Sequence, residues 1–177
     1  MKLVVLDRDG VINFDSDRFI KAPDEWRPIP GSLEAIALLN QSGYRVAVAT
    51  NQSGIGRGLL DMAAFNAIND KMTRQLAQVG GRIDAIFYCP HAADAQCACR
   101  KPMPGMLREI GRRFNSDLKA VPAVGDALRD LQAANAVGAT PILVTTGKGK
   151  LTLKEKELPE STQIFDDLAA VARRLVS

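Results

Sequence analysis

The chain has few soft metal ligands and few aromatic residues. Its 177 residues include one histidine, three cysteines and 5% aromatic residues. The odd cysteine count, confined to the stretch 89–99, is a poor basis for a disulfide framework. The first residues lack the apolar core of a secretory signal, and no apolar run approaches the roughly 18 residues that span a bilayer. We therefore expect a cytoplasmic protein that is not integral to a membrane.

The charge balance and composition are those of an ordinary globular chain. The formal net charge is +3 at pH 7, which is too small to imply nucleic-acid binding. Hydrophobic residues make up 46% of the chain and charged residues 24%, which excludes a disordered or fibrous protein. The length fits one domain, residues 1–177, and one site should therefore carry the function.

Short apolar, β-branched runs alternate with segments of helical period. Strands are predicted over 2–6, 44–49, 83–88, 120–124, 141–145 and 164–165. Helices, counted from their N-caps, are predicted over 32–42, 61–79, 104–114, 127–137 and from 167. Ser32 and Asp61 are the expected caps of the first two. This alternation predicts an α/β fold: a single Rossmann-like domain with a central parallel sheet, helices on both faces and no cap domain.

Polar side chains gather where the predicted strands end. Asp7 and Asp9 follow the first strand, the stretch 50–53 follows the second, and Asp126 follows the fourth. Lys101 opens the helix between the third and fourth strands. Taken alone, two aspartates before a glycine could be a turn. Because all four groups fall on the edge where parallel sheets bind ligands, we expect them to form one site.

This set of side chains suits the transfer of a phosphoryl group. Asp7 and Asp126 offer the hard oxygen ligands that Mg²⁺ prefers. With a cation present, a carboxylate such as Asp7 can attack phosphorus and form an aspartyl-phosphate. Asp9 can protonate the leaving oxygen and later take a proton from water. The Thr50 hydroxyl and the Lys101 ammonium can hold the phosphoryl oxygens.

The same residues resemble, in order, the four motifs of the haloacid dehalogenase (HAD) phosphatase superfamily. The matching stretches are 7–11, 50–54, 100–102 and 125–126. The resemblance spans most of the chain and implies an Mg²⁺-dependent phosphoric monoester hydrolase. One further acid, Asp130, either orients metal-bound water or faces solvent on a helix.

The resemblance also implies the role of each motif residue. The first aspartate of the superfamily motif, here Asp7, is the nucleophile, and the second, here Asp9, is the general acid/base. Its threonine and lysine, here Thr50 and Lys101, steady the phosphoryl group. Its last aspartate, here Asp126, completes the magnesium site with Asp7 and the backbone carbonyl of Asp9.

A second cluster supplies three thiolates and one imidazole, a set suited to tetrahedral Zn²⁺. It consists of Cys89, His91, Cys97 and Cys99. The alternative is three reduced cysteines and a solvated loop histidine, because the spacing departs from the zinc-finger pattern. Four protein ligands leave no open position, so the zinc would be structural. Because Cys99 directly precedes Arg100 and Lys101, a zinc-clipped loop 89–99 would fix where these cations point.

Within the superfamily, the Cys/His loop before Arg-Lys-Pro resembles two branches. These are the phosphatases of D-glycero-D-manno-heptose 1,7-bisphosphate, from lipopolysaccharide-core synthesis, and those of histidinol phosphate. The stretches 50–58, 100–107 and 146–148 favour the heptose branch. The five-residue spacer between His91 and Cys97 resembles the histidinol type, and Ala127 stands where heptose phosphatases often carry a lysine.

We expect removal of the C7 phosphate from the heptose bisphosphate, with histidinol phosphate as the alternative substrate. The partner is thus a small phosphorylated sugar, and we expect a monomer that binds neither nucleic acid nor membrane. Residues 13–27 are the expected flap over the pocket. The expected substrate contacts are Asp15, Arg18, Asn51, Gln52, Ser53 and Arg100. A different class remains open, a non-catalytic zinc-bearing binding module on a HAD scaffold, although a pure scaffold would not need the full set of acids and cations.

Overall fold

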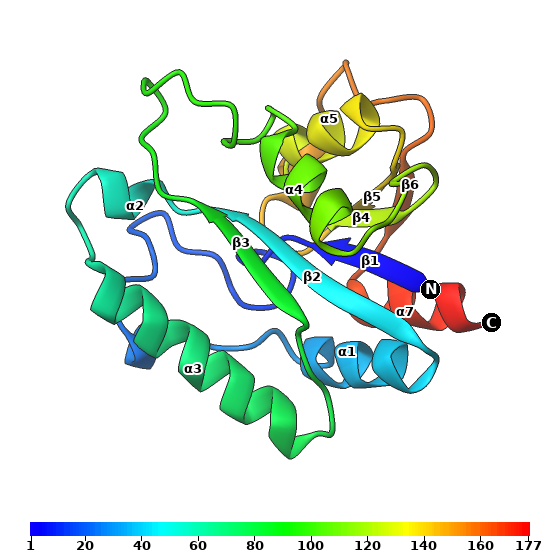
Figure 1. The fold of residues 1–177 in the computed structure, drawn as a ribbon, viewed down its shortest axis with the longest axis horizontal. Helices are drawn as coiled ribbons and strands as arrows, with labels where there is room; N and C mark the ends of the chain where they lie inside the picture. Colours follow the sequence, from blue (N-terminus) through cyan, green and yellow to red (C-terminus); the bar gives the residue numbers. More distant parts are fainter.

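Six parallel strands form the centre of the molecule in the order β3-β2-β1-β4-β5-β6. The computed structural model describes all residues, 1–177 (Figure 1). The strands are β1 (Lys2–Leu6), β2 (Tyr44–Asn51), β3 (Ala85–Cys89), β4 (Pro122–Gly125), β5 (Thr140–Val144) and β6 (Gln163–Phe165). The chain order reverses at β1, which lies between β2 and β4. In such sheets the ligand binds at the point of reversal, beyond the carboxyl ends of the strands.

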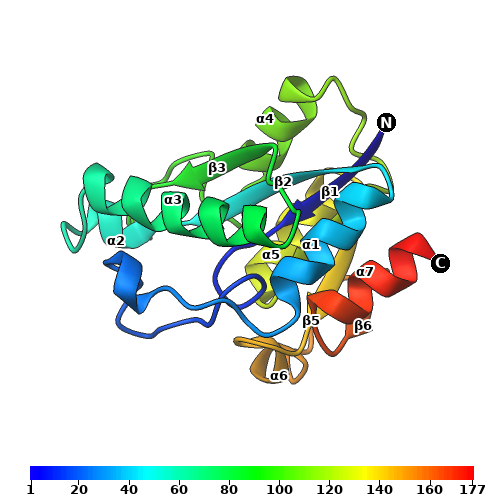
Figure 2. The same cartoon turned by 90° about the horizontal axis from the view of Figure 1, so that it is seen from below.

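Helices cover both faces of the sheet, as the sequence predicts. They are α1 (Ser32–Gln41), α2 (Ser53–Gly56), α3 (Met62–Gln78), α4 (Gly105–Arg113), α5 (Leu128–Ala136), α6 (Gly149–Thr152) and α7 (Leu168–Val176), with a 3₁₀ turn η1 (Pro23–Glu25). Figure 2 shows α1, α3 and α7 along one face and α4 on the opposite side. No helix is both long and apolar enough to cross a membrane.

The core explains why the strands are apolar on both faces. Successive side chains of β1 point in opposite directions. Val4 and Leu6 join a cluster of 23 buried residues beneath α1, α3 and α7. Leu3 and Val5 join a second cluster of 13 buried residues beneath α4 and α5. A central strand that buries both faces therefore reads as a continuous apolar run.

The main differences from the sequence-based expectation lie at the ends of elements. The Ser32 cap is wrong: Gly31, at φ +86°, occupies the cap position, while the Ser32 hydroxyl donates to the Val11 carbonyl at 2.9 Å. Asp61 is confirmed as a cap, because its carboxylate accepts the N–H of Ala64 at 2.8 Å. The short helices α2 and α6 were not expected, since one turn is too brief to show a helical period.

Candidate active site

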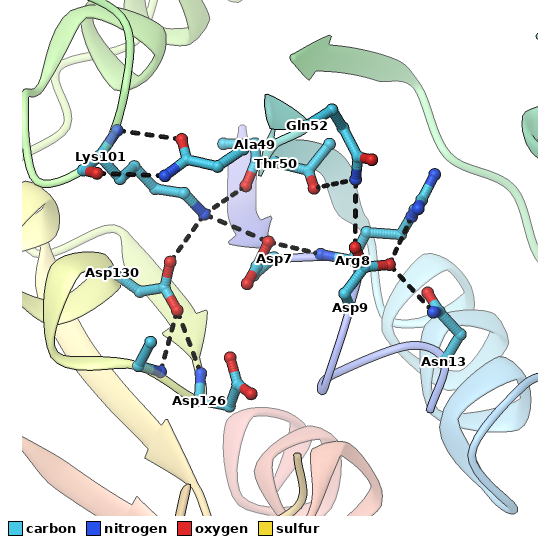
Figure 3. Close-up of polar contacts among 12 residues, drawn as sticks. Asp7, Arg8, Asp9, Asn13, Ala49, Thr50, Gln52, Lys101, Asp126 and Asp130 are labelled. Carbon is cyan, nitrogen blue, oxygen red and sulfur yellow. Dashed lines mark hydrogen bonds and ion pairs between the residues drawn. The ribbon is translucent and has the colours of Figure 1, made fainter. Parts of the chain in front are cut away.

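A buried lysine pairs with two acids at the carboxyl-end edge of the sheet (Figure 3). Lys101, which is 3% exposed, places its Nζ 3.2 Å from Asp7 Oδ1 and 2.7 Å from Asp130 Oδ1. It also donates to the Ala49 carbonyl at 2.7 Å. Burial alone would lower the pKa of Lys101, but Asp130 and Asp7 outweigh burial and raise it. The lysine therefore stays charged and neutralises part of the acid cluster.

The end of β2 fixes the backbone that carries Lys101. The strand continues to Asn51, two residues beyond its predicted end. The Asn51 side chain accepts the N–H of Lys101 at 3.0 Å and donates to the Lys101 carbonyl at 3.1 Å. Asn51, which the sequence predicts as a substrate contact, therefore positions the Lys101 backbone in this structure.

Asp130 is part of the site, and the alternative that it faces solvent is wrong. It is 7% exposed and occupies the first turn of α5. One of its oxygens pairs with Lys101, while the other accepts the N–H groups of Asp126 and Ala127 at 3.2 and 3.1 Å. Asp130 thus holds the turn that carries Asp126 into the cluster.

The carboxylates of Asp7, Asp126 and Asp130 are suited to a hard cation. Their ligand atoms lie within 4.8 Å of one another. Burial, and then the neighbouring Asp130, raise the pKa of Asp7 well above its usual range and that of Asp126 to about 7. Crowded buried carboxylates resist ionisation unless a cation offsets their charge. The oxygen-only donor set fits Mg²⁺, which is usually held by one or two carboxylates together with phosphate oxygens.

Two glycines allow Asp126 to approach the Asp7 strand. Gly10, at φ +87°, and Gly147, at φ +55°, both lie so close to the Asp126 carboxylate that a Cβ on either would collide with it. The Asp126 carboxylate also accepts the N–H of Lys148 at 2.8 Å. Gly10, the glycine that follows Asp7 and Asp9, is thus required both by its close approach to Asp126 and by its positive φ.

The Asp9 carboxylate is held by three side chains. Its Oδ1 accepts from Arg8 Nε at 2.8 Å and from Asn13 Nδ2 at 3.0 Å. Its Oδ2 accepts from Gln52 Nε2 at 3.2 Å, and Gln52 also donates to the Thr50 hydroxyl at 2.9 Å. Burial alone would raise the pKa of Asp9, but the charge of Arg8 and the hydrogen bonds from Arg8, Asn13 and Gln52 together outweigh burial and lower it. In this arrangement Asp9 is a carboxylate, the form that can take a proton from water.

These side chains line a cavity of about 310 Å³. Of the predicted site residues, it brings together Asp7, Asp9, Asp15, Thr50, Asn51, Gln52, Ser53, Arg100, Lys101 and Asp126. Arg18 is exposed and is not among the lining residues. Arg129 lines the cavity although the sequence analysis did not single it out. Its position three residues after Asp126, in the first turn of a predicted helix, was the signal that could have found it.

The segment expected to form a flap has two different halves. Asp15 and Ile20 mark the ends of a stretch that contributes to the cavity wall, and Asp15 lies 3.5 Å from the Lys148 ammonium. The later half is anchored: Trp26 is fully buried, and Lys71 of α3 donates to the carbonyls of Pro23 and Trp26 at 2.7 Å each. Only the earlier half of the segment therefore borders the site.

The cysteines and the histidine converge at the end of β3. Their ligand atoms lie within 4.8 Å of one another. Cys89 Sγ is 3.0 Å from Cys99 Sγ, 3.6 Å from Cys97 Sγ and 3.4 Å from His91 Nδ1. Burial raises the pKa of Cys89 to about 12, whereas hydrogen bonds, first from the Arg100 N–H, outweigh burial and lower the pKa of Cys97 to about 6. Three sulfurs and one imidazole nitrogen at one point fit a tetrahedral zinc site.

The sheet order and the acid–lysine cluster together define a phosphatase of the HAD type. In agreement, the family model of HAD-hydrolase-like proteins matches residues 98–171. D-glycero-beta-D-manno-heptose-1,7-bisphosphate 7-phosphatase from Bordetella bronchiseptica is 61% identical over 99% of this chain and 98% of its own. The enzyme of the same name from Pseudomonas putida is 56% identical over 99% of this chain and 100% of its own. The chain belongs to this family of heptose-bisphosphate phosphatases.

Solved structures agree with this assignment. The crystal structure of D,D-heptose 1,7-bisphosphate phosphatase from B. bronchiseptica, complexed with magnesium and phosphate, has a TM-score of 0.98 over 99% of this chain and 98% of that one, at 61% identity. The D,D-heptose 1,7-bisphosphate phosphatase from Burkholderia thailandensis has a TM-score of 0.80 over 100% of this chain and 99% of that one, at 54% identity. Fold and sequence therefore point to one family over the full length of the chain.

Proposed function

We propose that the protein removes the C7 phosphate of D-glycero-β-D-manno-heptose 1,7-bisphosphate with Mg²⁺, as a step in lipopolysaccharide-core heptose synthesis. The observation that carries this proposal is the buried cluster in which Lys101 holds Asp7 and Asp130 beside Asp126, in a chain 61% identical to a named 7-phosphatase. We further propose that the protein acts as a monomer in the cytoplasm.

Asp7 is the group that we assign to attack phosphorus. It lies at the carboxyl end of β1, and its Oδ1 is 3.2 Å from Lys101 Nζ. The attack forms an acyl-phosphate bond to Asp7 and breaks the bond between phosphorus and the sugar oxygen. The Lys101 ammonium and the Thr50 hydroxyl border the same cavity and can hold the oxygens of the transferring group.

Asp9 is the proton-transfer group in this scheme. When protonated, it delivers its proton to the departing sugar oxygen, and it is then a carboxylate held by Arg8, Asn13 and Gln52. In that form it takes a proton from the water that attacks the phosphoaspartate, which releases inorganic phosphate and restores Asp7.

Magnesium would be held by the side chains of Asp7 and Asp126 and by the backbone carbonyl of Asp9. When bound, Mg²⁺ offsets the repulsion between the carboxylates and the anionic phosphate. Asp130 supports this site indirectly, through the N–H groups of Asp126 and Ala127 and through the ion pair with Lys101.

The experiment that tests this function is a comparison of substrates with Mg²⁺ supplied. We expect kcat/KM for the β anomer of the heptose 1,7-bisphosphate to exceed that for the α anomer and for histidinol phosphate, because the relatives are named as 7-phosphatases of the β anomer. Phosphate release would be followed by a colorimetric assay, and NMR would identify the monophosphate product. A preference for histidinol phosphate would contradict the substrate, and no Mg²⁺-dependent phosphate release at all would favour the non-catalytic module.

We also propose that the Cys/His cluster holds a structural Zn²⁺ that fixes the loop 89–99. The loop leads directly to the catalytic lysine, and two hydrogen bonds anchor its C-terminal end: the Arg100 N–H donates to Cys97 Sγ at 3.4 Å, and the Gly105 N–H donates to the Ala98 carbonyl at 3.0 Å. A metal that ties the loop to the end of β3 would therefore orient Arg100 and Lys101.

Replacing Cys97 by Ser is expected to lower the zinc content and to weaken turnover by about tenfold or more, because misplacing reacting groups by about 1 Å costs roughly that much or more. Zinc would be measured by mass spectrometry on the same samples as kcat/KM. Ser116→Ala, at a half-buried serine after α4 and outside the loop 89–99, is the control. Full activity in a demonstrably zinc-free protein would refute the role of the metal.

A further inference from the structure

The residue between Asp7 and Asp9 is an arginine that lies in the apolar core. Arg8 is 0% exposed and does not line the active-site cavity. Its guanidinium carbon lies 5.9 Å from the centre of the Phe65 ring. Phe65 is itself buried and belongs to the cluster of 23 residues beneath α1, α3 and α7. The cation therefore approaches the site from behind, through the core, and not from the cavity.

Asp9 is the one carboxylate that balances this buried charge. Arg8 Nε lies 2.8 Å from Asp9 Oδ1, and Arg8 forms no other ion pair. Its Nη1 and Nη2 atoms are buried and have no hydrogen-bond partner. A buried charge that loses its partner is strongly unfavourable. Movement of the Asp9 carboxylate away from Nε would leave the guanidinium uncompensated, so the ion pair fixes the orientation of Asp9.

The two oxygens of the Asp9 carboxylate have different surroundings. Oδ1 accepts from Arg8 Nε and from Asn13 Nδ2, and the Arg8 carbonyl accepts the N–H of Asn13 at 3.3 Å. Oδ2 accepts only from Gln52 Nε2, which also donates to the Thr50 hydroxyl (Figure 3). A carboxylate oxygen can accept two hydrogen bonds, so Oδ2 keeps a lone pair for a proton. It is also the oxygen on the side of Thr50, which is assigned to the phosphoryl group.

We propose that Arg8 is a positioning residue for proton transfer: it holds Oδ1 of Asp9 from the core side and thereby aims Oδ2 at the leaving oxygen and at the attacking water. This inference rests on the proposed function, in which Asp9 moves the proton. Because Arg8 lies outside the cavity, it acts on the reaction only through Asp9. Its loss should therefore slow the steps that transfer a proton and leave the attack of Asp7 on phosphorus unaffected.

The test compares an alkyl with an aryl phosphate ester in the Mg²⁺-loaded enzyme. A sugar alkoxide needs a proton to depart, whereas p-nitrophenolate departs without one. For Arg8→Met, we expect kcat/KM for the heptose 1,7-bisphosphate to fall by about tenfold to a hundredfold, a part of what a general acid contributes. The kcat/KM for p-nitrophenyl phosphate should fall by less than about threefold, because this constant covers only the steps up to departure of the leaving group. The ratio of the two constants is the alkyl-to-aryl ratio.

A second substitution shows whether the effect passes through Asp9. In the Asp9→Asn background, Arg8→Met should change kcat/KM for the heptose 1,7-bisphosphate by less than about twofold, because the group that Arg8 aims is already absent. Arg8→Lys keeps a buried charge but not the planar Nε donor, and it should also lower the alkyl-to-aryl ratio, which provides the test if Arg8→Met does not fold.

The matched control is Leu76→Ala. Leu76 is fully buried in the same apolar cluster, about three turns along α3 from Phe65. Its truncation lowers the melting temperature without removing a donor to Asp9, so the alkyl-to-aryl ratio should stay at the wild-type value.

The outcomes separate Arg8 from the proposed function. If Asp9→Asn lowers kcat/KM equally for the two esters, the role of Asp9 as the acid is wrong, and that of Arg8 is wrong with it. If Asp9→Asn lowers the alkyl-to-aryl ratio while the folded variants at Arg8 keep it, the proposed function stands and the positioning role of Arg8 is wrong. The same conclusion follows if the losses from Arg8→Met and Asp9→Asn multiply in the double variant.

Discussion

Asp7→Asn is expected to reduce Mg²⁺-dependent phosphate release by about ten-thousandfold or more, because loss of a covalent nucleophile removes the whole catalytic unit. The amide has the shape of the carboxylate but is a poor nucleophile and a weaker ligand for Mg²⁺. Steady-state phosphate release and trapping of the phosphorylated protein by mass spectrometry would both be measured. Wild-type protein quenched in acid should carry one phosphate, and the variant none.

The stability of the same variant separates chemistry from folding. A carboxyl group whose pKa is higher in the folded than in the unfolded protein stabilises the fold while it is protonated, and this contribution is lost as the pH rises through the folded pKa. Burial and Asp130 raise the pKa of Asp7 in this way. In the metal-free protein the fold therefore disfavours the ionised form of Asp7, and at pH 8 Asp7→Asn should melt no lower than wild type. Asp61→Asn, at the exposed cap of α3, is the control. Near-wild-type turnover by Asp7→Asn would rule out the aspartyl-phosphate mechanism.

The architecture could be predicted from the sequence because it depends on patterns repeated many times. Apolar runs such as Leu3–Leu6 identify strands buried on both faces, and their alternation with helical segments predicts the parallel sheet. The position of the site follows from the topology, since acids after β1 and β4 must meet at one edge. The HAD resemblance, confirmed by the family relationship, rests on the same strand-end residues.

The details of the site could not be predicted, because they depend on contacts between distant residues. Asp130 reads equally well as a solvent-facing helix residue until the loop that carries Lys101 is placed 2.7 Å from it. The Asn51 amide is consistent with a substrate contact until its bonds to the Lys101 backbone are seen. Arg129 belongs to none of the four motifs; its place three residues after Asp126 is a weak signal, and the cavity shows that it lines the site. Sequence patterns locate reactive groups, whereas the supporting contacts are long-range.

Lys101→Met is expected to lower the free energy of unfolding of the metal-free protein by about 3–5 kcal/mol, the usual result of leaving buried charges without their partner. Lys101 is the cation that touches both Asp7 and Asp130, and its methylene chain can be replaced by Met without leaving a large cavity. The kcat/KM should fall by about a hundredfold to a thousandfold, because a donor to the transferring group is lost. Urea unfolding and steady-state kinetics would measure the two effects.

The pH dependence of this destabilisation identifies its cause. The pKa of Lys101 is raised, so its contribution is fully present below the unfolded value of 10.5, and the lysine is charged throughout pH 5 to 8. In the variant, Asp7 loses the lysine charge that favours its ionised form and its pKa rises further, so the deficit should be larger at pH 8 than at pH 5, because Asp7 takes up its proton as the pH falls. Added Mg²⁺ should restore part of the stability at pH 8, because it supplies positive charge to the same carboxylates. Lys119→Met, at an exposed lysine, should show neither effect. A deficit that is the same at pH 5 and pH 8 would mean that Lys101 contributes by packing and not by neutralising Asp7 and Asp130.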